Sequence, residues 1–232
     1  FKPGAPSVCV LTSNLSPRLP STNPPIHALV RELERRGLNV YPVTGFFKRL
    51  EYLKQIEPDV IVFIAHGRLA PGRSAQAREV LKQLDAPLLC PVIVHQPYDE
   101  WLESQKGMVG GMMAQNIVVP EIDGGVAPYA IGAQFPDKQG HLVFKPIPGR
   151  VETFSRLVHN YARLERTPAG DKRIAVVYYK GPGRNAMIAS GLEVAPSLLN
   201  LLQHLRDRGY RTGALPADAD ELTELIQRRG CV

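Results

Sequence analysis

Two carboxylates and two histidines in this sequence have the types and spacing to bind a metal or to transfer a proton. Glu121 and Asp123 lie two positions apart in the segment Pro-Glu-Ile-Asp-Gly-Gly. A carboxylate pair on a glycine-flanked turn can ligate a hard or borderline metal ion or accept protons. The structural alternative is an Asx turn in which Asp123 bonds the backbone of Gly125 while Glu121 is solvated. The spacing alone leaves both interpretations open.

His66 and His95 each end a predicted apolar strand. The carboxyl ends of parallel strands meet at one edge of a sheet, where folds of this class place their sites. The two imidazoles could therefore converge as metal ligands or as an acid/base pair that works near neutral pH. The alternative is that each histidine caps its strand and bonds a nearby carbonyl.

A third candidate is the loop Lys-Gly-Pro-Gly-Arg-Asn at positions 180–185. It lacks the ending and the glycine spacing of a nucleotide-binding loop, so ATP binding of that type is not expected. Lys180 and Arg184 can still pair with the carboxylates of a ligand.

The hydrophobic pattern predicts the elements that position these residues. Short apolar runs predict strands, and amphipathic stretches between them predict helices. The predicted strands are Ser7–Thr12, Asn39–Val43, Asp59–Ala65 and Pro87–His95. The predicted helices run from Pro24 to Arg35, from Phe46 to Gln55 and from Ser74 to Leu84. This alternation indicates an α/β protein with a flavodoxin-like, doubly wound parallel sheet.

The alternation stops after residue 95. Residues 96–166 are expected to form an irregular α+β insertion that contains the Glu121 segment and ends in a long helix, Arg150–Arg166. Within it we predict a helix at Tyr98–Ser104 and strands at Ile117–Pro120, Val126–Ile131 and Leu142–Lys145.

Residues 167–232 repeat the pattern of the N-terminal strand, loop and helix, which predicts the start of a second α/β domain. We expect a strand at Lys172–Tyr179, a helix at Val194–Arg208, a short strand after Gly209 and a helix at Asp218–Arg229. The first 95 residues form the parallel α/β domain in this scheme. Because another strand is due where the sequence stops, we expect the chain to be a piece of a longer protein.

Composition excludes several classes of protein. The chain has 232 residues, 44% hydrophobic and 22% charged, which is typical of a globular domain. No apolar run approaches the roughly 18 residues that a membrane span requires. The net charge of 28 − 22 = +6 is dispersed along the sequence, so we expect no nucleic-acid partner. The three cysteines are scattered without zinc-binding spacing.

Several motifs, in order, resemble the large subunit of the tetrapyrrole chelatases, the CobN/magnesium-chelatase H family. Trp101, Ser104 and Gly107 precede the methionine-rich stretch. Val-Val-Pro-Glu-Ile-Asp-Gly-Gly at 118–125 is similar to the family's Ala-Leu-Pro-Glu-Leu-Asp-Gly. Gly-Leu-Glu-Val-Ala-Pro-Ser-Leu-Leu-Asn-Leu-Leu at 191–202, followed by Gly209 and Tyr210, is the strongest element. The resemblance covers roughly residues 85–215.

The resemblance implies a metal chelatase, a ligase that inserts a divalent metal into a tetrapyrrole macrocycle of the corrin or porphyrin type. Cobalt and magnesium are the metals of the family. Magnesium chelatases often carry a second acid where Ala127 stands here, which favours cobalt and cobalamin biosynthesis. ATP would act only through partner subunits of the AAA+ ATPase class. The remainder of a much longer chain would be a further partner, and the cytoplasm the expected location.

The resemblance assigns a role to Glu121. It is expected to be catalytic, since two pyrrole protons must leave when the metal enters. Together with the strand-end positions and charges described above, this makes Glu121 and His95 the expected metal ligands. The residues expected to bind the macrocycle are His66, His95, Asp123, Lys180 and Arg184.

Other functions stay open at this point. This region could bind a tetrapyrrole or a partner without catalysing a reaction itself. A diverged relative could remove metal from haem, in the periplasm or at a membrane, or could chelate magnesium. A free-standing receptor of the periplasmic-binding or flavodoxin-like type is an alternative from another class, and it would need a complete second domain.

Overall fold

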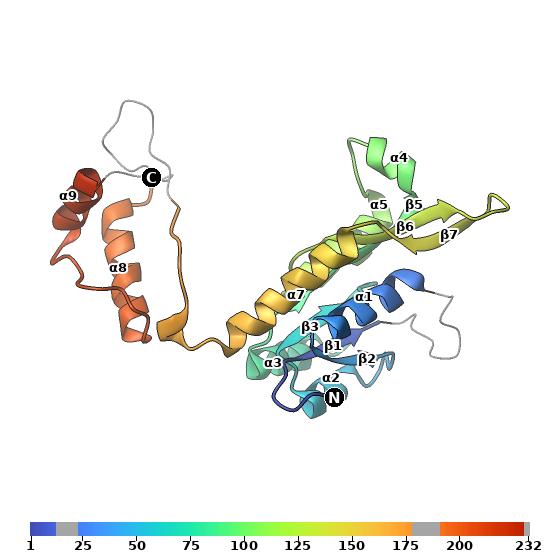
Figure 1. The fold of residues 1–232 in the computed structure, drawn as a ribbon, viewed down its shortest axis with the longest axis horizontal. Coiled ribbons are helices and arrows are strands. Elements are labelled where there is room, and N and C mark those ends of the chain that lie inside the picture. The colour runs from blue at the N-terminus through green and yellow to red at the C-terminus, as the bar shows by residue number, and fades with distance from the viewer. Residues whose placement is uncertain (13–22, 178–190, 230–232) are drawn as a thin grey trace. The chain divides into compact units, whose positions relative to one another are not determined.

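The computed structural model of the protein describes residues 1–12, 23–177 and 191–229. The contacts divide the chain into two compact units, Phe1–Glu165 and Arg166–Val232. The first unit is drawn from blue to yellow in Figure 1 and contains the sheets.

A parallel four-stranded sheet forms the centre of the first unit. Its strands are β1 (Ser7–Leu11), β2 (Asn39–Val43), β3 (Val60–Phe63) and β4 (Leu88–Leu89), in the order β2-β1-β3-β4. Val8 of β1 lies opposite Val40 of β2 and Val60 of β3. This order, with β1 between β2 and β3, confirms the predicted flavodoxin-like doubly wound topology.

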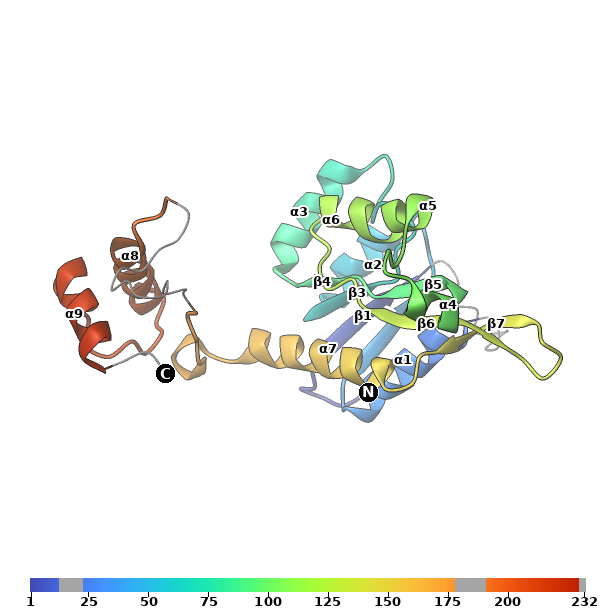
Figure 2. The same ribbon diagram turned by 90° about the horizontal axis from the view of Figure 1, so that it is seen from above.

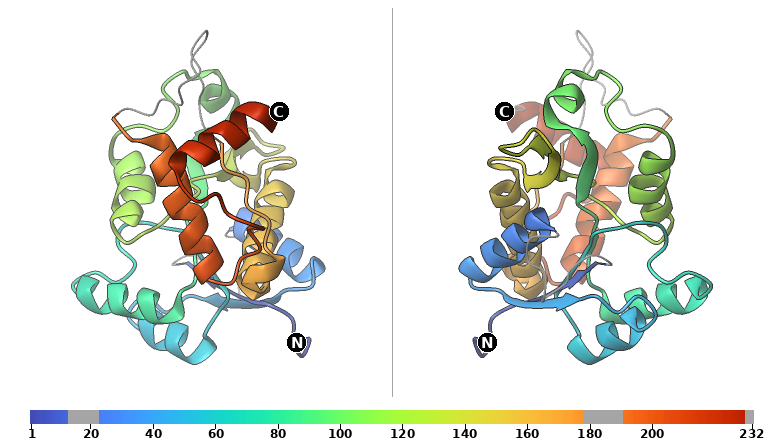
Figure 3. Two further views of the ribbon diagram at one scale, coloured as in Figure 1. Left: turned by 90° about the vertical axis from the view of Figure 1, so that its left-hand side faces the viewer. Right: turned by 90° about the vertical axis from the view of Figure 1, so that its right-hand side faces the viewer.

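Helices cover both faces of this sheet, as its almost wholly apolar strands require. Figure 3 shows α1 (Pro24–Arg35) and α7 (Arg150–Arg166) together on one face, with α2 (Arg49–Ile56) and α3 (Ser74–Leu84) on the other. Leu29 of α1 and Phe154 of α7 are fully buried in one core cluster. Leu53 of α2 and Val80 of α3 belong to the second cluster. Alternate side chains of each strand therefore supply two separate cores.

A second sheet contains β5 (Val92–Pro97), β6 (Ala130–Pro136) and β7 (Leu142–Pro146). β5 and β6 are parallel, whereas β6 and β7 form an antiparallel hairpin that extends from the unit (Figure 1). The predicted single strand Pro87–His95 is therefore wrong, because it is two strands in different sheets. Pro91 has no N–H to donate, and the chain changes partner there, from β3 to β6.

The predicted strand Ile117–Pro120 is also wrong, since residues 110–122 form one helical run. The run consists of α5 (Gly110–Met113), a π-helical segment η2 (Ala114–Val118) and α6 (Val119–Ile122), and its two ends are labelled in Figure 2. The β-branched residues at 117–119 suggested a strand. Pro120 in a regular α-helix would clash with the carbonyl four residues earlier, and the wider π turn just before it accommodates the ring.

The remaining elements of the insertion follow the prediction more closely. The helix α4 spans Tyr98–Glu103 and β7 begins at Leu142. The predicted strand at Val126–Ile131 is displaced toward the C-terminus, because β6 begins only at Ala130. Val126 instead forms an isolated parallel bridge with Leu89, and its carbonyl accepts the N–H of Cys90 at 2.8 Å.

The second unit contains a short 3-10 turn η3 (Ala169–Asp171), α8 (Val194–Asp207) and α9 (Ala219–Arg229). Both predicted helices are present. Residues 172–177 and 210–213, where the two strands were predicted, form no strand. The last two residues of the predicted strand Lys172–Tyr179 lie outside the described residues. Val177 is 93% exposed, so this apolar segment lacks the covering that a buried parallel strand needs.

Within the part of the chain that the structure describes, no helix has both the length and the apolar character needed to cross a membrane.

The packing of β6 on α1 gives a prediction about stability. A methyl group added at Gly132 would lie 2.5 Å from Cγ of Pro25, whereas one added at Gly111 meets no atom within 4 Å. We expect Gly132→Ala to lower the free energy of unfolding by about 1–3 kcal/mol, since overpacking forces the helix to shift. Urea unfolding followed by the fluorescence of Trp101, in the same unit, measures the change. Gly111→Ala is the matched control, and equal stability of the two variants would contradict this packing.

Candidate functional site

The candidate site lies at the carboxyl ends of β3 and β5. His66 follows β3 by three residues, and His95 lies within β5. The pairing register of β5 with β6 shifts between Ile93 and Pro97, so His95 occupies an irregular stretch of the strand. Such irregularities re-aim side chains and are frequent beside functional sites. Both histidines are exposed, and the His95 ring packs at 4.9 Å from the ring of Phe144.

His66 is near enough to affect the protonation of His95. The pKa of His95 is lowered, first by partial burial of the ring and then by repulsion from a protonated His66. A lowered pKa keeps the imidazole neutral at pH 7, which is the form that binds a metal or accepts a proton. The convergence of these two side chains on a metal or a proton stays a prediction.

Glu121 and Asp123 have different environments although they are two positions apart. Glu121 lies in α6 with its side chain exposed, and the described residues offer it no side-chain hydrogen bond or ion pair. The Asp123 side chain is only 4% exposed. One of its oxygens accepts two bonds from Arg68, from Nε at 2.9 Å and from an Nη at 2.6 Å, and the other accepts the N–H of Leu69 at 2.7 Å.

The Asx turn considered for Asp123 is not formed. The N–H of Gly125 donates instead to the carbonyl of Pro120 at 2.9 Å, which closes the end of the helical run. A Cβ at Gly125 would lie 2.6 Å from Sγ of Cys90 and 2.9 Å from that same carbonyl. Only glycine fits this position without displacing a neighbour. Gly125 therefore allows the turn to pack closely against Cys90, the residue that follows β4.

A second contact joins the loop after β3 to the helical run. The N–H of Gly67 donates to the carbonyl of Gln115, in the π-helical segment, at 2.8 Å. The loop after β3 is therefore bonded both to the middle of the helical run and to the turn that ends it. His66 immediately precedes Gly67, and Glu121 lies in α6, the last part of the helical run.

The two described cysteines are not candidate nucleophiles. Burial raises the pKa of Cys9 to about 12. The pKa of Cys90 is also raised to about 12, by burial and then by the negative charges of Asp123 and Glu121. A thiol with so high a pKa is protonated at pH 7 and neither attacks nor ligates.

The structure thus joins Asp123 to the loop that carries His66, and His66 is near enough to His95 to lower its pKa. Lys180 and Arg184 lie outside the described residues. Among the described residues, no group of three or more His, Cys, Asp or Glu side chains is arranged to hold a metal ion. Arg68 is the residue that sequence reasoning missed, because its partner is 55 positions away and no periodicity links them.

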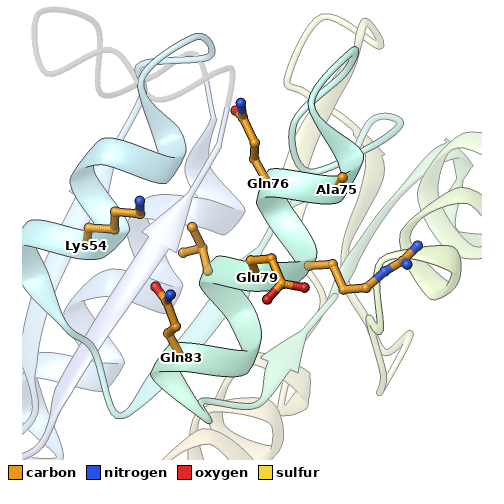
Figure 4. A pocket seen from close by; sticks show the side chains of 7 residues that line it. Lys54, Ala75, Gln76, Glu79 and Gln83 are labelled. Atoms are coloured by element: carbon orange, nitrogen blue, oxygen red, sulfur yellow. The ribbon is translucent and has the colours of Figure 1, made fainter.

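Two pockets on the first unit lie elsewhere. One, of about 320 Å³, opens on α2 and α3 between Lys54 and Gln83 (Figure 4). The other, of about 470 Å³, lies between α1 and the start of α7. Neither is lined by a predicted site residue, so the candidate site is an exposed edge and not one of these pockets.

The fold and the site define a class: a flavodoxin-like parallel α/β domain whose inserted helical run is bonded, through the turn that ends it, to the loop that carries His66. The model of the CobN/Magnesium Chelatase family matches residues 1–231. The chain therefore belongs to this family, as the motifs at 101–107, 118–125 and 191–202 predicted. The match extends well beyond residues 85–215, the region that those motifs cover.

Individual relatives agree with this assignment. The chain is 31% identical over 218 residues to the H-type subunit of the magnesium chelatase of Chlorobaculum parvum, an alignment that covers 86% of this chain and 16% of that protein. It is 26% identical over 223 residues to the CobN protein of the aerobic cobaltochelatase of a Sinorhizobium species, covering 87% of this chain and 17% of the relative. The chain thus spans about one sixth of the length of these relatives.

A solved structure has the same fold. The catalytic subunit of cobaltochelatase from Mycobacterium tuberculosis superposes with a TM-score of 0.78 at 26% identity. The superposition covers 97% of this chain and 20% of that one.

The contact between the histidines can be tested by titration. We expect His66→Ala to raise the pKa of His95, since the substitution removes a positive charge that opposes protonation. NMR titration of the imidazole Cε1–H signals measures the shift. His141→Ala, at the exposed tip of the β6–β7 hairpin, should leave the pKa of His95 unchanged. An unchanged or lowered pKa in His66→Ala would show that the two rings do not interact.

Proposed function

We propose that this chain is part of the large, macrocycle-binding subunit of a metal chelatase, and that its substrates are a divalent metal and a corrin- or porphyrin-type tetrapyrrole. The names of the relatives support this, since both the cobalt and the magnesium enzymes are among them. The observation that carries the proposal is the exposed carboxylate of Glu121, two residues before Asp123, whose side chain is bonded to the loop that carries His66.

Glu121 would act as the base. When a divalent metal enters the macrocycle, two pyrrole N–H bonds break and two protons leave, so that the metal replaces them without a change of oxidation state. An exposed carboxylate with no partner among the described residues can accept such a proton and pass it to water. Its neighbour Asp123 is already bonded to Arg68 and to Leu69, which leaves Glu121 as the available acid of the pair.

His66 and His95 favour cobalt over magnesium as the metal substrate. Imidazole nitrogen suits the borderline first-row metals, whereas magnesium prefers oxygen ligands and keeps much of its water. A neutral His95 could receive cobalt and pass it toward the macrocycle, with Glu121 as the second ligand. Lys180 and Arg184 are proposed to meet the carboxylates of the tetrapyrrole.

The proposal has further parts that follow from family membership. ATP-dependent work would come from AAA+ ATPase partner subunits in the cytoplasm, and other regions of a longer chain would complete the macrocycle site. In this scheme residues 1–95 support the site, residues 96–166 supply Glu121, and residues 167–232 begin the next domain.

The role of Glu121 can be tested by substitution in the full-length subunit with its ATPase partners. We expect Glu121→Gln to lower the rate of cobalt insertion by about 10²- to 10⁴-fold, the usual contribution of a general base. Absorbance of the metallated macrocycle measures the rate. Glu103→Gln, an exposed acid at the end of α4, is the matched control and should insert at the normal rate.

Binding must be measured beside the rate. Titration with a metal-free corrin precursor, protoporphyrin and haem, followed by the shift of the Soret band, shows which macrocycle the subunit takes and whether Glu121→Gln still takes it. Normal insertion by Glu121→Gln would contradict the catalytic assignment and leave this region a binding module.

A further inference from the structure

We propose that Asp123 and Arg68 are positioning residues: their ion pair fastens the loop after β3 to the turn after α6 and thereby fixes His66 relative to Glu121. This inference rests on the proposed function, because it concerns how the same site is held. In this role Asp123 does not bind the macrocycle, in contrast to the expectation from the sequence.

The Asp123 carboxylate already accepts three hydrogen bonds within the fold. One oxygen accepts two bonds from the Arg68 guanidinium and the other accepts the backbone N–H of Leu69. The side chain of Asp123 is 4% exposed and that of Arg68 is 30% exposed. To ligate a metal or a macrocycle, Asp123 would have to give up charge-assisted bonds in a largely buried setting, which is costly.

Only a short length of chain separates each residue of the ion pair from a site residue. His66 is two residues before Arg68, and Glu121 is two residues before Asp123. The second of these connections is also held by backbone bonds. The N–H of Asp123 bonds the carbonyl of Pro120 at 3.0 Å, and the N–H of Gly124 bonds the carbonyl of Glu121 at 3.0 Å. A movement of Asp123 therefore moves Glu121 with it.

The loop after β3 is attached to the helical run and its final turn at two points. The Gly67 N–H bond to the carbonyl of Gln115 lies on one side of Arg68, and the Leu69 N–H bond to Asp123 lies on the other. Two attachment points stop the loop from rotating about a single ion pair. Gly67 has φ +94°, and a Cβ there would lie 3.1 Å from Oε1 of Gln115, so a glycine suits this close approach.

Positioning of this kind has a recognisable kinetic effect. Reacting groups must be held close to their productive geometry, and a displacement of about 1 Å can cost about 10²-fold in rate. Loss of the ion pair should therefore lower kcat through Glu121, while the affinity for the macrocycle changes little. A residue that binds the macrocycle would instead raise KM when it is replaced.

The test is a double-mutant cycle in the full-length subunit with its ATPase partners. We expect Asp123→Asn to lower kcat for cobalt insertion by about 10- to 100-fold, with KM for the macrocycle within about twofold of the normal value. Arg68→Lys keeps the positive charge but loses the planar guanidinium that donates two hydrogen bonds to Asp123. It should therefore retain more activity than Arg68→Met, which loses both. In a Glu121→Gln background, Asp123→Asn should cause little further loss, because the group that it positions is gone.

A control and a stability measurement separate positioning from folding. Arg73→Met removes another arginine–carboxylate pair, with Glu51, from the neighbouring loop and should leave kcat unchanged. Tm is measured for every variant; if Asp123→Asn does not fold, Arg68→Lys and Arg68→Met carry the cycle with Glu121→Gln. Equal losses with and without Glu121, or a rise in KM with normal kcat, would overturn the positioning role.

The outcomes also separate this inference from the proposed function. If Glu121→Gln inserts cobalt normally, the proposed function fails whatever Asp123→Asn does. If Glu121→Gln is inactive while Asp123→Asn and Arg68→Met are normal, the proposed function stands and the positioning role is wrong.

Discussion

The buried carboxylate of Asp123 is the constraint on which the arrangement of this site depends. A carboxylate that is 4% exposed must be neutralised and fully hydrogen-bonded, and Arg68 and the Leu69 N–H meet both requirements. The two partners come from the loop after β3, whereas Asp123 comes from an insertion 55 positions later. Satisfying one charge thus joins two segments that each carry a candidate site residue.

The change of sheet at Pro91 makes this contact possible. β4 is only two residues long, and the chain then joins a different sheet in which β5 pairs with β6. The short β4 leaves room for the turn after α6, which lies against it through the bridge of Val126 to Leu89 and the close approach of Gly125 to Cys90. The insertion is therefore packed into the edge of the parallel sheet. The turn that follows Glu121 is, as a result, bonded to the loop that carries His66.

Much of this fold could be predicted from the sequence, because its apolar residues repeat with the spacing of helices and strands. The bounds of Asn39–Val43, Ser74–Leu84 and Arg150–Arg166 agree residue for residue with the pattern of apolar positions. The predicted elements were wrong where the structure depends on contacts between residues far apart in the sequence. The β-branched run before Pro120 favours a strand by propensity, yet it is helical because its tertiary contacts decide. In the second unit, residues 172–177 resemble a strand but have no sheet partner among the described residues.

The candidate site was predictable in its residue types but not in its connections. Strand-end positions indicated His66 and His95, and a motif indicated Glu121. The different environments of Glu121 and Asp123 depend on an ion pair across 55 positions, which no spacing rule reveals.

The central proposal is that Glu121 and His95 together receive the metal at one edge of the first unit. Anomalous diffraction at the cobalt edge, from crystals of the full-length subunit soaked with cobalt(II) and no macrocycle, tests it most directly. We predict an anomalous peak about 2.0–2.2 Å from an imidazole nitrogen of His95 and a carboxylate oxygen of Glu121, as for other nitrogen and oxygen ligands of borderline metals. A cobalt peak elsewhere, with this edge empty, would contradict it.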